Sequence, residues 1–401
     1  MSNEEKNRIA DNVSGIPFSP IRKFFDIVNE MKEAISLGIG EPDFITPWHI
    51  RSAAIQSIKD GETSYSSNAG TMELRREISR YMKDRFQLDY SPEHEILVTV
   101  GASEAIDLSL RALINPGDEV IIPDPSYVSY MPNVCLVHGV PVALPTYAKD
   151  NFRITPEQLK KAITPRTKAL ILPYPNNPTG AVMPRENLEA IAPIIEEADI
   201  MVISDEIYSE LTYSGRHASI AAIEGMKERT ILINGFSKSF AMTGWRVGFI
   251  CTPPEIMNAV YKIHQYTIMC ASTMSQAAAC EAMRYNIDNN YEDIVKMRES
   301  YDMRRRYIFN AFNKMGLDCF EPMGAFYVFP CIKSTGLNSD TFCERLLREK
   351  HVAVVPGSAF GQSGEGYVRC SYAASLENIK EAMKRIESFV NQVRNSEDKA
   401  V

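Results

Sequence analysis

Short apolar runs alternate with helical patterns along much of this chain, from about residue 95 onward. Parallel strands cannot be joined by a tight turn, and their connections are usually helices that cover the faces of the sheet. The alternation therefore predicts an α/β fold with a mostly parallel sheet covered by helices. The expected strands lie in EILVTV (95–100), DEVIIPDP (118–125), KALILPYP (168–175), IMVISDE (200–206) and RTILING (229–235).

The pattern changes in the last third of the chain. A long helical pattern over residues 277–315 is followed by three short apolar runs and an amphipathic helix at 375–393. These features predict a second, smaller α/β unit, and a length of 401 residues suits one large domain plus a smaller one. We expect the large domain at 47–290 and the small C-terminal domain at 291–401. The short runs are AFYVFP (325–330), VAVVPG (352–357) and GYVRCSYA (366–373).

Charge and composition argue against several classes of function. The formal net charge is −8, so we expect no electrostatic attraction to nucleic acid or to an anionic membrane. No apolar run reaches about 18 residues, and the polar, acidic start does not resemble a secretory signal. The eight cysteines include no C-x-x-C pair and histidines are few, which favours reduced thiols in a cytoplasmic protein over disulfides or a metal site.

Two turns that follow expected strands carry candidate binding groups. In an open parallel sheet, ligands bind beyond the carboxyl ends of the strands. Gly101, Ala102 and Ser103 separate a strand from a helix, where free N–H groups and the helix dipole can bind an anion. Asn177, in the proline-rich loop at 173–180, can offer its amide to a ligand oxygen. Either stretch alone also fits an ordinary turn, with Ser103 as a helix N-cap in the first.

Three further stretches, on or next to expected strands, carry charged or phenolic side chains. Asp205 ends an apolar strand, and Tyr208 follows three residues later. A buried carboxylate needs a cationic partner, although an aspartate here also fits a helix N-cap. Lys238 lies between two serines in a small-residue loop, with Arg246 eight residues on, and a solvated lysine is the ordinary alternative. Arg369, on an apolar strand, requires a carboxylate or phosphate, from a ligand or from an internal salt bridge.

Taken together, these groups describe one ligand, pyridoxal 5′-phosphate (PLP). Lys238 can form a Schiff base, and Asp205 can keep the pyridine nitrogen protonated. Tyr208 and Asn177 can hydrogen-bond the ring oxygen O3′ and favour its anion, which lowers the proton affinity of the imine at Lys238. Each of these groups also has an ordinary structural explanation on its own. Five of them in this order along the sheet would be an improbable coincidence if each had only its structural role. The phosphate is assigned to the helix start with Ser237 and Arg246.

Seven motifs, spread over nearly the full length of the chain, resemble those of the class I/II aminotransferases of PLP fold type I. As a set these motifs are highly specific. The resemblance implies a PLP fold type I architecture, with Lys238 as the Schiff-base lysine, Asp205 at the ring nitrogen and Tyr208 with Asn177 at O3′. The motifs are SLGIGEPDF (36–44), YSSNAG (65–70), VTVGASEAI (98–106), PNNPTG (175–180), SDEIYSEL (204–211), SKSFAMTGWRVGF (237–249) and GYVRCSYA (366–373).

The resemblance also assigns roles that residue chemistry alone does not. It implies that Tyr127 stacks on the cofactor ring, and that Tyr65 reaches the phosphate from the partner subunit. It implies that Gly40, Asn177 and Arg369 receive the α-carboxylate of the substrate. The phosphate ligands within one chain would be Ala102, Ser103, Ser237 and Arg246.

The same resemblance implies a homodimer with shared active sites. Residues 1–46 would form an N-terminal arm and a segment of the small domain, with SGIPFSPIRKFF (14–25) as the part at the interface. The chain is most similar to bacterial aminotransferases for N-acetyl-LL-diaminopimelate, aspartate or aromatic amino acids. Two positions depart from the aspartate branch, since Ser103 stands where a lysine is common and Tyr127 where a tryptophan is common. Both departures argue against strict aspartate specificity.

The expected activity is transfer of the amino group of an L-amino acid to a 2-oxo acid, 2-oxoglutarate in our interpretation, by a ping-pong mechanism in amino acid biosynthesis. The same residues also support β-elimination, so a PLP-dependent C–S β-lyase is the enzymatic alternative. A PLP-sensing transcription regulator would need an added DNA-binding domain, for which the chain offers neither room nor a basic N-terminal segment.

Overall fold

The computed structural model of the chain describes residues 8–18 and 33–397. Its largest element is a seven-stranded sheet with the order β2-β8-β7-β6-β5-β3-β4. Neighbouring strands are parallel except at β8, which runs antiparallel to both β2 and β7. The expected α/β fold with a mostly parallel sheet is therefore confirmed. The strands are β2 (Ile96–Thr99), β3 (Glu119–Asp124), β4 (Val140–Pro145), β5 (Thr167–Leu172), β6 (Met201–Asp205), β7 (Thr230–Gly235) and β8 (Gly248–Cys251).

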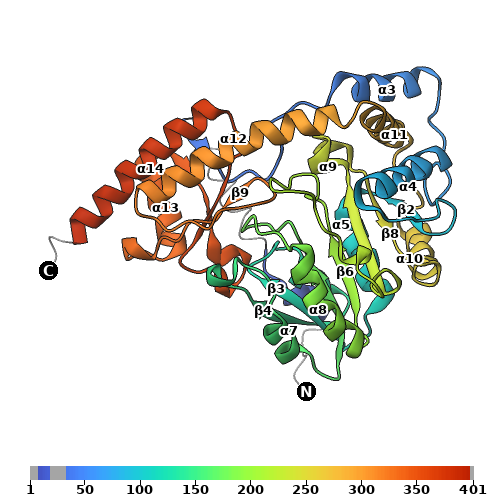
Figure 1. The fold of residues 1–401 in the computed structure, drawn as a ribbon, viewed down its shortest axis with the longest axis horizontal. Helices are drawn as coiled ribbons and strands as arrows, with labels where there is room; N and C mark the ends of the chain where they lie inside the picture. Colours follow the sequence, from blue (N-terminus) through green and yellow to red (C-terminus); the bar gives the residue numbers. More distant parts are fainter. Residues whose placement is uncertain (1–7, 19–32, 398–401) are drawn as a thin grey trace.

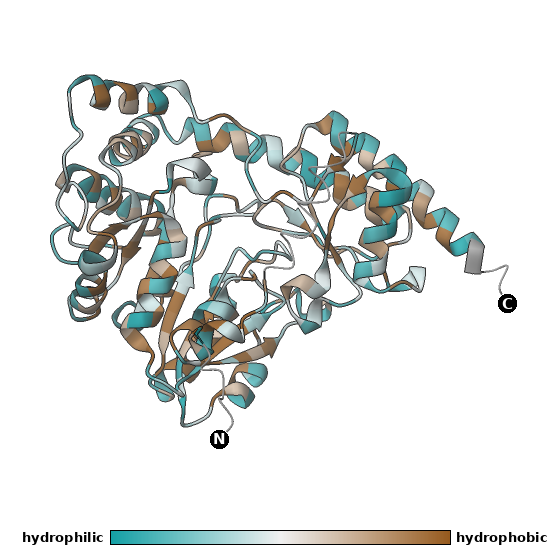
Figure 2. Cartoon of the chain, turned by 180° about the vertical axis from the view of Figure 1, so that it is seen from behind, coloured by the Kyte–Doolittle hydropathy of each residue, from teal (hydrophilic) through white to brown (hydrophobic). Residues whose placement is uncertain are grey.

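Helices cover both faces of this sheet because its central strands are apolar on both sides (Figure 1). Successive residues of a strand enter different cores, so that Val202 and Ile203 of β6 pack on opposite faces. Figure 2 shows brown, apolar strands in the interior and teal on the outer sides of the helices. One face carries α5 (Gly101–Leu113), α6 (Tyr130–Leu136) and α10 (Pro254–Thr267), and the other α3 (Trp48–Lys59), α4 (Met72–Phe86), α7 (Pro156–Ala162), α8 (Arg185–Glu197) and α11 (Thr273–Asp288).

A long helix, α12 (Glu292–Lys314), leads from the large sheet to a smaller α/β unit (Figure 1). There, β9 (Tyr327–Val328), β11 (Val355–Pro356) and β12 (Val368–Ser371) form an antiparallel sheet in the order β11-β12-β9. A second, two-stranded sheet pairs β1 (Ile35–Ser36) with β10 (Val352–Ala353) in parallel. Two helices, α13 (Ser339–Lys350) and α14 (Leu376–Glu397), complete this unit around an aromatic core.

The long helical pattern expected at 277–315 is divided into two helices. Asn290 and Tyr291 both adopt left-handed backbone conformations between α11 and α12, which ends one helix and starts the next in a new direction. The alternation of apolar runs also did not predict β4 or β8. Within the described ranges, no helix combines the length and the apolar character that crossing a membrane requires.

The N-terminal part of the chain contacts both units. The strand β1 pairs with β10 of the smaller unit, whereas the short helix α1 (Asp11–Ser14) lies against α6 of the large one. Asn12 Nδ2 donates a hydrogen bond to the carbonyl oxygen of Leu136 at 2.9 Å. Residues 19–25 of the expected interfacial segment lie outside the described residues. The domain boundaries at 46 and 290 stay a prediction.

Candidate active site

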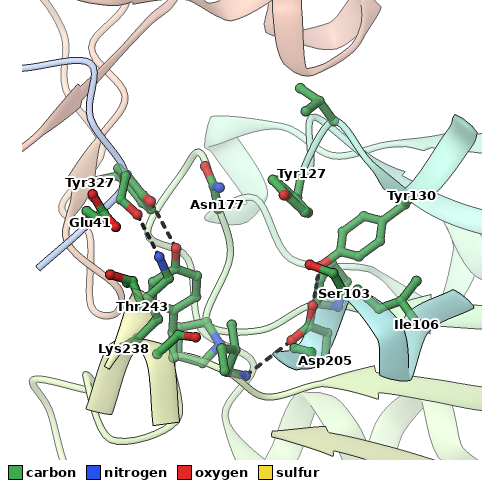
Figure 3. A pocket seen from close by; sticks show the side chains of 18 of the residues that line it. Glu41, Ser103, Ile106, Tyr127, Tyr130, Asn177, Asp205, Lys238, Thr243 and Tyr327 are labelled. Carbon is green, nitrogen blue, oxygen red and sulfur yellow. Dashed lines mark hydrogen bonds between the residues drawn. The ribbon is translucent and has the colours of Figure 1, made fainter. Parts of the chain in front are cut away.

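A cavity of about 590 Å³ opens at the carboxyl ends of the large-sheet strands, where the smaller unit meets them. Its walls come from segments that are far apart in the sequence (Figure 3). Eleven of the twelve predicted site residues line it, which are Gly40, Ala102, Ser103, Tyr127, Asn177, Asp205, Tyr208, Ser237, Lys238, Arg246 and Arg369. The topological rule for open parallel sheets therefore located the cavity correctly.

Lys238 lies directly after β7, in the one-turn helix α9 (Phe236–Ser239) rather than in the loop expected from its small neighbours. Its Nζ donates a hydrogen bond to the carbonyl oxygen of Gly40 at 2.6 Å. Burial lowers the pKa of the Lys238 amine to about 8 against the attraction of Glu41, and the cations Arg369 and Arg246 lower it further. A lysine with this pKa is partly neutral, and hence nucleophilic, near physiological pH.

Asp205 is the last residue of β6 and is buried. Tyr130 donates its hydroxyl to Asp205 Oδ2 at 2.8 Å, and the backbone N–H of Ile207 donates to Oδ1 at 3.2 Å. Burial raises the pKa of the Asp205 carboxyl to about 6, and these two hydrogen bonds act against that rise. No cationic side chain of the described residues hydrogen-bonds to this carboxylate, so its negative charge is available to a cationic ligand group.

The sequence reasoning missed Tyr130 as a site residue. It stands three residues after Tyr127 and is the first residue of α6. Their centroids lie 5.6 Å apart in an edge-to-face arrangement. The spacing Tyr127-x-x-Tyr130 was the available signal, but only the fold brings the second hydroxyl to Asp205.

Arg369 on β12 is buried and partly satisfied by groups already in place. Its Nη1 donates to Asn177 Oδ1 at 2.9 Å, and its Nη2 donates to the carbonyl oxygen of Gly38 at 2.6 Å. Its Nε is buried without a hydrogen-bond partner. The guanidinium is therefore held in a fixed orientation and retains capacity to donate to an anion.

A second cluster of groups suited to an anion surrounds the start of α5. Gly101 has φ +74°, and a Cβ atom there would lie 2.6 Å from Arg246 Nη2, so the guanidinium rests directly on the first turn of the helix. Arg246 itself has a left-handed φ of 52° and donates from Nη1 to the carbonyl oxygen of Thr243 at 3.0 Å. Free N–H groups, the hydroxyls of Ser103 and Ser237 and this cation suit a phosphate.

Tyr65 is the predicted site residue that does not line the cavity. Its side chain is 81% exposed, in the segment between α3 and α4. That segment is fastened to α10 and α11, because Asn68 O lies 2.9 Å from His264 Nε2 and Thr273 Oγ1 donates to Glu62 O at 3.0 Å. Tyr65 thus lies at the surface, in a segment that these two hydrogen bonds hold in place.

The sheet order, the helix-covered large unit and the smaller α/β unit define a fold type I enzyme with a cavity between the units. The family model "Aminotransferase class I and II" matches residues 32–386 of the chain. The chain therefore belongs to the class I and II aminotransferases, which are PLP-dependent enzymes that act on amino and 2-oxo acids.

Similar proteins carry different substrate names. The chain is 47% identical to an aspartate aminotransferase of Pyrococcus abyssi, over 96% of the chain and 98% of that protein. It is 45% identical to the "Probable N-acetyl-LL-diaminopimelate aminotransferase" of Bacillus subtilis, over 95% of each. A crystal structure of an aromatic aminotransferase from Pyrococcus horikoshii superimposes with a TM-score of 0.88 at 46% identity, covering 92% of this chain and 99% of that one.

Proposed function

We propose that this chain is a PLP-dependent aminotransferase in which Lys238 holds the cofactor and moves the proton of the substrate. The observation that supports this most strongly is the pair of perturbed groups in one cavity. A lysine whose pKa is lowered to about 8 faces the same space as a buried aspartate whose pKa is raised to about 6. Strongly perturbed groups in a cavity are typical of functional sites.

The residues present fit PLP. Asp205 offers a buried negative charge to a protonated pyridine nitrogen, and the first turn of α5 with Arg246 offers an anion site to the phosphate. The Tyr208 hydroxyl and the Asn177 amide line the same space and suit the ring oxygen. When bound, PLP supplies an aldehyde carbon that exchanges amines and a ring that accepts electrons from the substrate Cα.

The chain's own residues would then act as follows. Arg369, fixed by Asn177 and by the Gly38 carbonyl, orients the substrate through its α-carboxylate. Lys238 Nζ, once free, would take the proton from Cα and deliver it to the former aldehyde carbon in the first half-reaction, and would move a proton the opposite way, to Cα of the new amino acid, in the second. Asp205 keeps its negative charge near the ring nitrogen throughout. The amino donor leaves as a 2-oxo acid before the acceptor binds, which is a ping-pong order.

The lining of the cavity favours a long or apolar side chain in the amino donor over aspartate. Within the described part of the chain, its only cationic lining residues are Lys238, Arg246 and Arg369, and each has a role above. Glu41 adds a negative charge, and Ser103 offers a hydroxyl rather than an ammonium group. A short dicarboxylate therefore lacks a partner for its distal charge. We propose glutamate and 2-oxoglutarate as the second substrate pair, whose longer chain would carry the distal carboxylate past these lining residues.

We propose that the enzyme is a two-fold homodimer. Four exposed apolar side chains lie on the segments that hydrogen bonds of His264 and Thr273 hold together. A group of exposed apolar side chains of this kind marks an interface. A second copy bound there would bring its own Tyr65 toward the anion site. The four are Tyr65, Tyr266, Ile268 and Met269.

The test of this function is a substrate screen on the PLP-loaded protein. We expect aromatic, aliphatic and N-acyl-diaminopimelate-like donors to transfer their amino group to 2-oxoglutarate, yielding glutamate. If kcat/KM for aspartate exceeds the others tenfold or more, about 1.4 kcal/mol in transition-state free energy, our reading of the cavity is wrong. Release of pyruvate and ammonia from cystathionine without amino transfer would identify the β-lyase instead.

A further inference from the structure

Tyr327 connects the two halves of the cavity. It lines the cavity (Figure 3), begins β9 in the smaller unit and is fully buried. Its hydroxyl lies 2.9 Å from the hydroxyl of Tyr208 in the large unit. Its ring lies under the Arg369 guanidinium, with 4.5 Å between Arg369 Cζ and the ring centroid. One side chain thus contacts the tyrosine proposed for the cofactor and the arginine proposed for the substrate.

The Tyr327 hydroxyl lies close against the backbone at Gly40. A Cβ atom on Gly40 would lie 2.6 Å from Tyr327 Oη, so only glycine admits the hydroxyl where it stands. The neighbouring Gly40 carbonyl accepts the hydrogen bond from Lys238 Nζ. The position of the hydroxyl is therefore set by a close backbone approach rather than by loose packing.

Once an anion is present, the number of protons that the two phenols can donate fixes the direction of the Tyr327–Tyr208 hydrogen bond. Each phenol has one proton to donate and can accept hydrogen bonds as well. Among the described residues, Tyr208 is the only hydrogen-bond partner of the Tyr327 hydroxyl. If Tyr208 donates to a ligand oxyanion, it cannot also donate to Tyr327, so Tyr327 must donate to Tyr208. The hydrogen bond that Tyr327 donates to Tyr208 strengthens the hydrogen bond that Tyr208 donates to the oxyanion.

We propose that Tyr327 is a positioning residue: its hydroxyl turns the proton of Tyr208 toward the cofactor oxygen, and its ring holds the face of Arg369. The proposal rests on the function proposed above. It predicts two separable effects, one on the electronic state of the bound cofactor and one on the affinity for carboxylates. Removing the hydroxyl alone affects the first, whereas removing the ring affects both.

The first experiment is a double-mutant cycle with a spectroscopic readout. The midpoint of the pH titration of the visible band is measured for the PLP-loaded protein, for Tyr327→Phe, for Tyr208→Phe and for the double variant. We expect Tyr327→Phe to raise the midpoint by about half a pH unit, because a weaker hydrogen bond stabilises the cofactor oxyanion less. We expect this rise to disappear in the Tyr208→Phe background, since Tyr327 acts through Tyr208.

Tyr372→Phe is the matched control. Tyr372 is buried in the same core and donates to the Ala325 carbonyl at 3.1 Å, but it does not line the cavity. We expect the pH midpoint of the visible band in Tyr372→Phe to equal that of the unmodified protein. An unchanged midpoint in Tyr327→Phe, or an equal shift in both Tyr208 backgrounds, would overturn the inference. If the unmodified protein shows no visible band with PLP, the proposed function fails, and the inference fails with it.

The second experiment measures the role of the ring. Binding of the unreactive carboxylate 3-phenylpropionate to the PLP-loaded protein is followed by calorimetry. We expect Tyr327→Phe to bind it within twofold of the unmodified protein, because the aromatic face under Arg369 remains. We expect Tyr327→Leu to bind about threefold to thirtyfold more weakly, as a lost cation–π contact requires. Equal affinities for the phenylalanine and leucine variants would contradict the assignment of the ring.

Discussion

At the scale of single residues, the site depends on two groups that burial moves away from their ordinary ionisation. Lys238 has its pKa lowered to about 8, and Asp205 has its pKa raised to about 6. Near pH 7 the aspartate is mostly charged and a fraction of the lysine is neutral. The same cavity can therefore offer a nucleophilic amine and a fixed negative charge at one pH.

The lysine predicts a pH dependence for cofactor attachment. Only the neutral amine of Lys238 attacks an aldehyde, so the rate of visible-band formation should rise with pH and level off above about pH 8. An ordinary lysine would give a rate that still rises toward its pKa of 10.5. Stopped-flow absorbance of the cofactor-free protein mixed with PLP gives this profile. A rate that keeps increasing up to pH 10 would contradict the lowered pKa.

The aspartate predicts opposite effects on activity and stability. The folded-state pKa of Asp205 lies above its ordinary value of 3.8, so the folded protein loses stability as pH rises through 6. Asp205→Asn removes this buried charge, so it should raise the unfolding free energy of the cofactor-free protein at pH 8 by up to about 3 kcal/mol. The increase should be smaller below pH 4, where Asp205 is already protonated. Denaturant unfolding at the two pH values measures this difference.

The same Asp205→Asn variant should lose at least about two orders of magnitude in amino-transfer rate, because the ring nitrogen loses its charged partner. A variant that transfers amino groups within threefold of the unmodified rate would remove the proposed role. A variant that is destabilised equally at both pH values would instead contradict the cost of the buried charge.

From the sequence we identified the residues whose chemistry is unusual for their place, but not the hydroxyl contacts that support them. Asp205 and Arg369 stood out because charged groups on apolar strands need partners. Tyr130 carries no such signal, and for Tyr327 the sequence indicates only an aromatic side chain near the pocket. Their hydroxyls meet Asp205 and Tyr208 across separations of 75 and 119 residues, which only the fold establishes.

At the scale of elements, the predicted strands were those with continuous apolar runs. Strand β4 lies at the edge of the sheet and has mostly exposed or half-buried residues, so it carries little apolar signal. Strand β8 is only four residues long and runs antiparallel to its neighbours. It is therefore not part of the strand–helix alternation from which the other strands were predicted. The helix pattern at 277–315 did not reveal its break because Asn290 and Tyr291 are not helix breakers as strong as proline.

The start of α5 allows a test of the anion site. Gly101→Ala introduces a Cβ atom 2.6 Å from Arg246 Nη2 at a residue with positive φ. We expect it to weaken PLP binding at least tenfold, about 1.4 kcal/mol, while binding of pyridoxal, which lacks the phosphate, changes little. Equilibrium dialysis of the two compounds gives both affinities.

Gly117→Ala is the matched control for this variant. Gly117 also has positive φ, at +90°, but no atom lies within 4 Å of the added Cβ. Both variants should lose about 1–2 kcal/mol of stability from backbone strain, and only Gly101→Ala should lose phosphate affinity. Equal loss of pyridoxal and PLP affinity in Gly101→Ala would show that the helix start does not bind the phosphate.

At the scale of the whole molecule, the exposed apolar group around Tyr65 predicts the assembly. We expect light scattering to give the mass of a dimer. Met269→Asp places a charge among these side chains and should shift the protein toward monomer and lower its PLP affinity. Met303→Asp changes a methionine on α12 that is at least as exposed and should leave the dimer intact. An unmodified protein that is active as a monomer would refute the shared site.

Lys238 is the residue that we propose holds the cofactor, and one measurement tests this directly. The PLP-loaded protein is reduced with borohydride, which fixes the pyridoxyl group to the amine that carries it, and its peptides are mapped by mass spectrometry. We expect the label on Lys238 alone, and no label in Lys238→Ala. A label on another lysine, or an equal label in Lys238→Ala, would contradict it.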